Sequence, residues 1–80
     1  MNTLPTGLTG RIIFHVYELN EVVVTGAAGD VLASRPLPRE IRDDAGYDRG
    51  LYNLGYRRTS PWRIDEDDAN SIRCEVEPQA

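Results

Sequence analysis

His15 is the only histidine in the chain, and it limits the catalytic chemistry that the sequence can support. A nucleophilic serine or cysteine normally needs a base beside it, most often a histidine. Here the histidine lies between Phe14 and Val16, inside the strongest strand pattern, where a structural role is more common than a catalytic one. Carboxylate pairs of the glycosidase type need a cleft, which 80 residues leave little volume to build, and the glycine-rich residues 26–30 lack the lysine of a phosphate loop. We therefore expect a protein that is not an enzyme and needs no cofactor.

A run of acidic side chains occupies positions 65–68. With Asn70 it supplies oxygen ligands of the kind that calcium binds, but the glycine and the final glutamate of a calcium-binding hand are not placed correctly. We therefore interpret 65–70 as a solvated polar turn and expect no metal site. A second interpretation is that closely spaced carboxylates imitate a phosphate backbone and face a basic surface on a partner. The acidic, partner-facing candidates are Asp65, Glu66, Asp67, Asp68, Glu75 and Glu77.

The residues best suited to binding a partner lie between positions 47 and 63. This aromatic–arginine stretch holds three of the four tyrosines and the only tryptophan. Tyrosine, tryptophan and arginine dominate binding hot spots, and aromatic rings beside arginine also stack on the bases of single-stranded nucleic acid. The alternative is that Trp62 and one or two tyrosines fill the core, and the sequence leaves both interpretations open. The partner-binding candidates are Tyr47, Arg49, Tyr52, Tyr56, Arg57, Arg58, Trp62 and Arg63.

A short pattern overlaps the start of this stretch. Pro38-Arg39-Glu40-Ile41-Arg42, followed by Gly46 and Gly50, covers about 13 of the 80 residues. Its spacing resembles that of AbrB-like swapped-hairpin DNA-binding regulators and antitoxins. The resemblance would imply a dimer that binds DNA with Arg39 and Arg42 near the phosphates. The basic Thr-x-Lys-Gly stretch that precedes the pattern in that family is absent, so we do not assign the chain to it.

The single cysteine, Cys74, excludes an internal disulfide and a cysteine-rich zinc site. If residues 71–77 form a strand, Cys74 shares one face with Ile72 and Val76, while charged side chains take the other face. Cysteine in that position is typical of a small core residue.

Size and charge indicate one small domain over residues 1–80. A chain of this length buries only about 60% of the surface that its unfolded form exposes. No apolar run approaches the roughly 20 residues of a membrane span, and residues 1–10 do not resemble a secretory signal, so we expect a cytoplasmic protein that does not enter a membrane. The net charge is −4, and residues 65–80 hold six acids against one arginine. This acidic balance argues against general binding of nucleic acid.

Hydrophobic alternation predicts a mostly β fold of four or five short strands with one short helix. The expected form is a small antiparallel meander or an SH3-like roll or barrel. Residues 1–10 are expected to be a loose lead-in, 47–55 loop or irregular strand, and 78–80 a frayed tail. Only Leu19 and Asn20 separate the first two strands, which predicts a tight hairpin. The expected strands are 11–18, 21–25, 31–35, 56–64 with a break at Pro61, and 71–77, and the expected helix is 38–45.

These features lead us to expect a non-enzymatic protein-binding module that occupies a surface on a larger partner. Such a protein is typically an inhibitor or adaptor, including those carried by phages and other mobile elements. The partner can itself have a basic or nucleic-acid-binding surface. Two alternatives remain open: a small nucleic-acid-binding regulator that uses residues 39–63, and a subunit of a homo-oligomeric assembly such as a homodimer. The apolar character of both faces of residues 11–18 keeps the last of these open.

Overall fold

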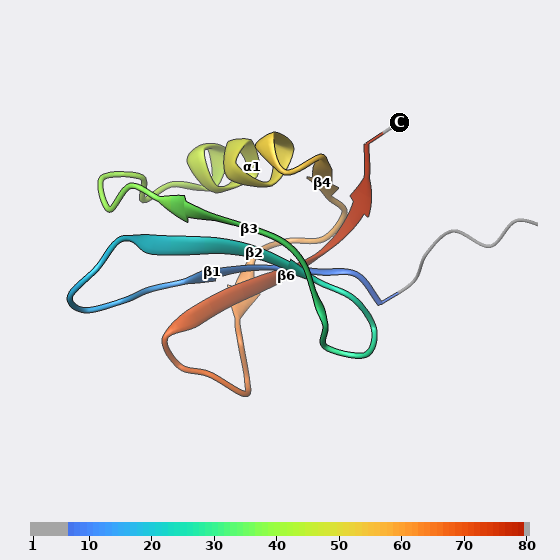
Figure 1. The fold of residues 1–80 in the computed structure, drawn as a ribbon, viewed down its shortest axis with the longest axis horizontal. Coiled ribbons are helices and arrows are strands. Elements are labelled where there is room, and N and C mark those ends of the chain that lie inside the picture. Colours follow the sequence, from blue (N-terminus) through green and yellow to red (C-terminus); the bar gives the residue numbers. More distant parts are fainter. Residues whose placement is uncertain (1–6, 80) are drawn as a thin grey trace, which may run out of the picture.

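The computed structural model describes residues 7–79, which form a curled antiparallel sheet with one helix packed on it (Figure 1). The mostly β prediction with a single short helix is confirmed, and the sheet curls into a half-barrel. The elements in chain order are β1 (Thr9–Ile13), β2 (Asn20–Thr25), β3 (Val31–Leu37), α1 (Asp44–Asn53), β4 (Tyr56–Arg58), β5 (Arg63–Ile64) and β6 (Ser71–Pro78).

The strand order across the sheet is β3-β2-β1-β6-β4, with β5 paired to β6. The first three strands form the predicted meander, and the last strand returns to the free edge of β1. Ile12 in β1 lies opposite Val22 of β2 and Ile72 of β6. Because the opposed residues of paired strands share a face, this row is apolar across three strands.

The core lies between this face of the sheet and α1. Period-2 alternation directs its strand members inward, and Tyr47 and Leu51 face them from the helix. Cys74 is fully buried here as a free thiol, and burial raises its pKa to about 12, so the prediction of a core cysteine is confirmed. The core residues are Leu8, Ile12, Val22, Val24, Leu37, Tyr47, Leu51, Cys74 and Val76.

The helix is displaced from its expected position. We predicted it at 38–45 and placed irregular chain at 47–55, whereas α1 spans Asp44–Asn53. Asp43 is the N-cap, and its side chain accepts a hydrogen bond of 2.8 Å from the amide of Gly46. Gly55, with φ of +94°, follows the helix end.

The first strand is shorter than predicted, and the tight hairpin is wrong. β1 ends at Ile13, and residues 14–19 form a loop between β1 and β2. The amide of His15 donates a hydrogen bond of 3.2 Å to the side-chain oxygen of Asn20. This amide therefore does not continue the backbone hydrogen bonding between β1 and β2. The third strand continues through Pro36 to Leu37, because β3 is an edge strand, where proline is tolerated.

The two ends of the described chain are better ordered than expected. Leu8, Thr9 and Gly10 are buried, so these residues are not a loose lead-in; positions 1–6 lie outside the described residues. A Cβ on Gly10 would come within 2.9 Å of side-chain atoms of Leu51 and Val76, which shows how closely β1 approaches the helix. Pro78 belongs to β6, and the amide of Gln79 donates to the carbonyl of Gly55 at 2.9 Å; position 80 is outside the described residues. Across residues 7–79, α1 is the single helix and is too short and polar to cross a membrane.

Candidate functional site

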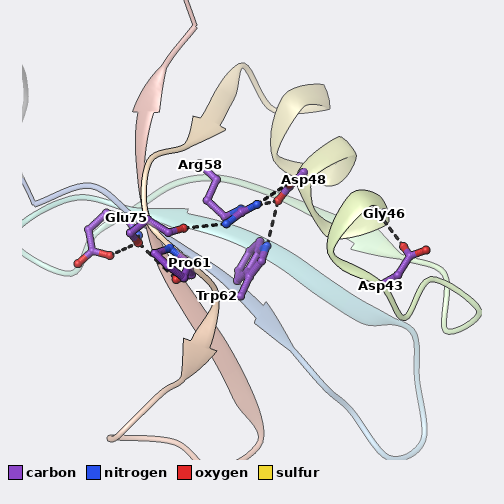
Figure 2. A network of polar contacts seen from close by, with 8 residues as sticks. Asp43, Gly46, Asp48, Arg58, Pro61, Trp62 and Glu75 are labelled. Atoms are coloured by element: carbon purple, nitrogen blue, oxygen red, sulfur yellow. Dashed lines mark hydrogen bonds and ion pairs between the residues drawn. The ribbon is translucent and has the colours of Figure 1, made fainter.

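Asp48 on α1 joins two members of the aromatic–arginine stretch (Figure 2). Its carboxylate accepts hydrogen bonds from Nε and Nη2 of Arg58, at 2.8 and 3.0 Å, and from the indole Nε1 of Trp62, at 2.9 Å. The bonds from Arg58 and then from Trp62 lower the pKa of Asp48 against the opposing effect of burial. Arg58 and Trp62 therefore hold the 58–62 segment against the helix.

Two more arginines of the stretch form ion pairs with β6. Both terminal nitrogens of Arg63 contact the carboxylate of Glu75, at 3.0 and 2.8 Å, and Arg57 pairs with Glu77. Ser60 also donates a hydrogen bond to Glu75. Arg63 and then Ser60 lower the pKa of Glu75 to about 2. These pairs neutralise positive charge that we expected to face a partner.

The aromatic residues of the stretch divide between core and surface. Tyr47 is buried, and its ring packs edge-on against Phe14 and Trp62, with centroids 6.3 and 5.8 Å away. Trp62 and Tyr56 are partly buried against the core, whereas Tyr52 is 65% exposed. For Tyr47 the structure favours the core interpretation, because the residue is buried in the core cluster.

The acidic candidates also separate. Asp65 is only 3% exposed and accepts hydrogen bonds from the amide of Asp67, Nε of Arg11 and Oγ of Ser71, at 3.0, 2.9 and 3.2 Å. The amide of Asp67 and then the Arg11 guanidinium lower the pKa of Asp65. The prediction that Asp65 faces a partner is wrong, because its carboxylate is buried and already accepts hydrogen bonds from the polar turn and from Arg11 of β1. Glu66, Asp67 and Asp68 are exposed in the polar turn, as predicted.

No group of three or more His, Cys, Asp or Glu side chains within residues 7–79 is arranged to hold a metal ion.

The surface that the sequence analysis missed is the loop of residues 14–19, called here the apolar loop. Val16 is 73% exposed, Tyr17 98% and Leu19 52%, and Phe14 is exposed as well. The loop, blue to cyan in Figure 1, projects at one end of the sheet. Sequence reasoning assigned these residues to a strand because their apolar character alternates. The sequence signal that could have revealed the loop was the apolar character of both faces of residues 11–18, because the core covers only one face of the sheet.

Two hollows lie beside the apolar loop. One, of about 460 Å³, runs between the loop and β3, where Arg35 and Pro36 line it. The other, of about 310 Å³, is lined by Arg39 and Arg42 from the segment before α1 and by Phe14 and Tyr47. His15 lines both hollows, and its two ring nitrogens each lie 3.6 Å from a carboxylate oxygen, of Glu18 and Glu21.

Comparisons of the chain with protein-family models, with curated proteins and with solved structures found no match.

Proposed function

We propose that the chain is a non-enzymatic protein-binding module, an inhibitor or adaptor in the cytoplasm, that occupies a surface on a larger partner. The observation that carries the proposal is the exposure of Val16, Tyr17 and Leu19 together on one six-residue loop. Single exposed apolar residues are ordinary, but a contiguous group is typical of an interaction surface. Burying such a group against a partner removes apolar area from water, at roughly 25 cal/mol per Å² before the costs of association.

This proposal moves the binding surface away from most of the aromatic–arginine stretch. Arg58 and Trp62 are bonded to Asp48, and Tyr47 is in the core. Arg49 and Tyr52 remain on the surface near the C-terminal end of α1, and Arg57 is exposed on β4. Figure 1 shows that end of the helix far from the apolar loop, so the two surfaces can be tested separately.

The test is capture of partners from a nuclease-treated lysate of the source organism with the tagged protein and two variants. The loop variant carries Val16→Ser, Tyr17→Ser and Leu19→Ser, and the stretch variant carries Arg49→Ala, Tyr52→Ala and Arg57→Ala. All six side chains are exposed, so both variants should keep the far-UV circular dichroism and melting temperature of the unchanged protein. We expect one protein to be captured by the unchanged protein and the stretch variant and lost with the loop variant.

Other outcomes contradict parts of the proposal. Loss of the captured protein only with the stretch variant would return the binding surface to Arg49, Tyr52 and Arg57. Recovery that depends on nucleic acid would favour the regulator alternative, although Arg57, Arg58 and Arg63 already pair with carboxylates. Capture of the chain itself, with dimers in sedimentation that the loop variant abolishes, would favour the homo-oligomer.

A further inference from the structure

The hollow formed by Arg39, Arg42, Phe14 and Tyr47 has the composition of a site for an anionic group. Two guanidinium groups bring positive charge, and the aromatic rings of Phe14 and Tyr47, packed edge to face, give it an apolar wall. None of its lining residues carries a carboxylate. Arginine is well suited to carboxylate because its planar donors can form two parallel bonds to the two oxygens.

Asn20 adds an independent observation. It is 7% exposed and lines this hollow, and its Oδ1 accepts a hydrogen bond of 3.2 Å from the amide of His15. That bond fixes the orientation of the side-chain amide, so Nδ2 is directed away from the loop backbone. Within residues 7–79 Nδ2 donates no hydrogen bond. Within residues 7–79 the fully buried side-chain nitrogen without a partner is Nε of Arg73, so Nδ2 of Asn20 remains accessible from the hollow and can donate to an acceptor that enters it.

The neighbouring acids are committed to other groups or lie outside the hollow. Asp43 caps α1 through the amide of Gly46, and Glu18 and Glu21 lie 3.6 Å from the ring of His15. Burial and the charges of Asp43 and Asp44 raise the pKa of Tyr47, so these two acids lie close enough to act on this side of the hollow. The nearby negative charge favours a singly charged carboxylate over a doubly charged phosphate, because like charges repel at short range.

We propose that this hollow receives the carboxylate of an acidic residue, or of a chain end, in a peptide segment of the partner whose apolar side chains pack on the apolar loop. The hollow and the loop share Phe14 and His15, so one segment can reach both. This inference rests on the proposed function and adds the chemistry of the partner: an acidic and apolar segment, rather than the basic surface expected from residues 65–77.

The test is a titration of the ¹⁵N-labelled protein, followed by NMR, with phenylacetate and with its neutral isostere phenylacetamide. The side-chain amide of Asn20 gives its own pair of resonances and reports directly on the hollow. We expect these resonances and the amide of His15 to shift saturably with phenylacetate and not with phenylacetamide. In a variant with Arg39→Gln and Arg42→Gln, phenylacetate should bind about tenfold more weakly or worse, because charge-assisted hydrogen bonds are lost. Arg49→Gln, outside the hollow, is the matched control and should leave binding unchanged.

Equal shifts with phenylacetamide, no saturable shift of the Asn20 resonances, or unchanged affinity in the double variant would overturn the inference. A parallel titration with inorganic phosphate that gives tighter binding than phenylacetate would also overturn it, in favour of a phosphate site. These measurements need no partner, so they stand even if the capture experiment fails. Conversely, a partner that is lost with the loop variant but retained by the Arg39 and Arg42 variant would preserve the proposed function and exclude the carboxylate site.

Discussion

The indole nitrogen of Trp62 donates a 2.9 Å hydrogen bond to Oδ1 of Asp48, which joins the segment after Pro61 to the middle of α1 (Figure 2). The same carboxylate binds Arg58 with two bonds. One acidic side chain thus satisfies the polar groups of two residues whose types alone indicate a binding hot spot. Its position explains why Arg58 and Trp62 are structural.

Asp48→Ala should lower the free energy of unfolding by about 1–3 kcal/mol, because a partly buried guanidinium and an indole N–H lose their acceptor. Urea denaturation at neutral pH measures the change. Glu66→Ala, an exposed acid of the polar turn, is the control and should change stability by less than about 0.5 kcal/mol. Equal effects of the two substitutions would show that the contacts of Asp48 do not stabilise the fold.

Stability should fall in acid because three carboxyl groups titrate lower in the folded state. The pKa values of Asp48 and Asp65 are lowered and that of Glu75 is about 2. In the unfolded chain, carboxyl groups have pKa values of about 4. The unfolded chain therefore takes up protons first, and stability that is present above about pH 5 is lost as the pH falls towards about 2.

Urea denaturation between about pH 6 and pH 2.5 measures this loss. Asp65→Asn should be less stable at neutral pH, since Asp65 accepts from Arg11 and Ser71, and should show a shallower dependence on pH. Denaturation midpoints that do not move with pH in the unchanged protein would contradict the assigned ion pairs.

Replacing each of two glycines of α1 by alanine should change the stability of the protein in opposite directions. A Cβ on Gly46 would lie 2.3 Å from Cγ2 of Ile41 and 2.8 Å from the capping oxygen of Asp43, so Gly46→Ala should displace the cap and cost about 1–2 kcal/mol. A Cβ on Gly50 would meet Leu37 and Val22 at 3.5 Å or more, which is ordinary contact. Gly50→Ala should therefore stabilise by about 0.5–1 kcal/mol through the unfolded state.

Thermal melting of both variants checks this pair of predictions. A stabilising Gly46→Ala would mean that Ile41 is not seated against the start of α1, and a strongly destabilising Gly50→Ala would mean that the helix packs closer to β2 than 3.6 Å contacts imply.

These glycines also show why the helix could not be located from the sequence. Gly46 and Gly50 lower helix propensity and favour a loop. Gly46 is nevertheless needed where α1 begins against Ile41, and Gly50 lies where α1 packs on Val22 and Leu37. Those contacts are tertiary and leave no local pattern. The strands were easier to predict, because alternation around Ile12 and Cys74 is a direct consequence of one buried face.

The candidate site was harder to predict than the fold. Residue type identifies Trp62 and Arg58 as suited to binding, but their exposure depends on Asp48, which reaches them only after the helix docks. For the apolar loop, residue type predicts a strand where the structure has a loop. Val16 and Tyr17 have strand-forming side chains, but they lie outside the sheet because β1 ends at Ile13. Alternation alone therefore does not separate the loop from the strand that it continues.

Site-specific photocrosslinking tests most directly whether the apolar loop is the binding surface. A photoreactive phenylalanine derivative replaces Tyr17 in one protein and Tyr52 in another, at 98% and 65% exposed positions. In the source organism's lysate, the account predicts a covalent adduct with one partner from position 17 and none from position 52. An adduct from position 52 alone would contradict it and place the binding surface on the aromatic–arginine stretch.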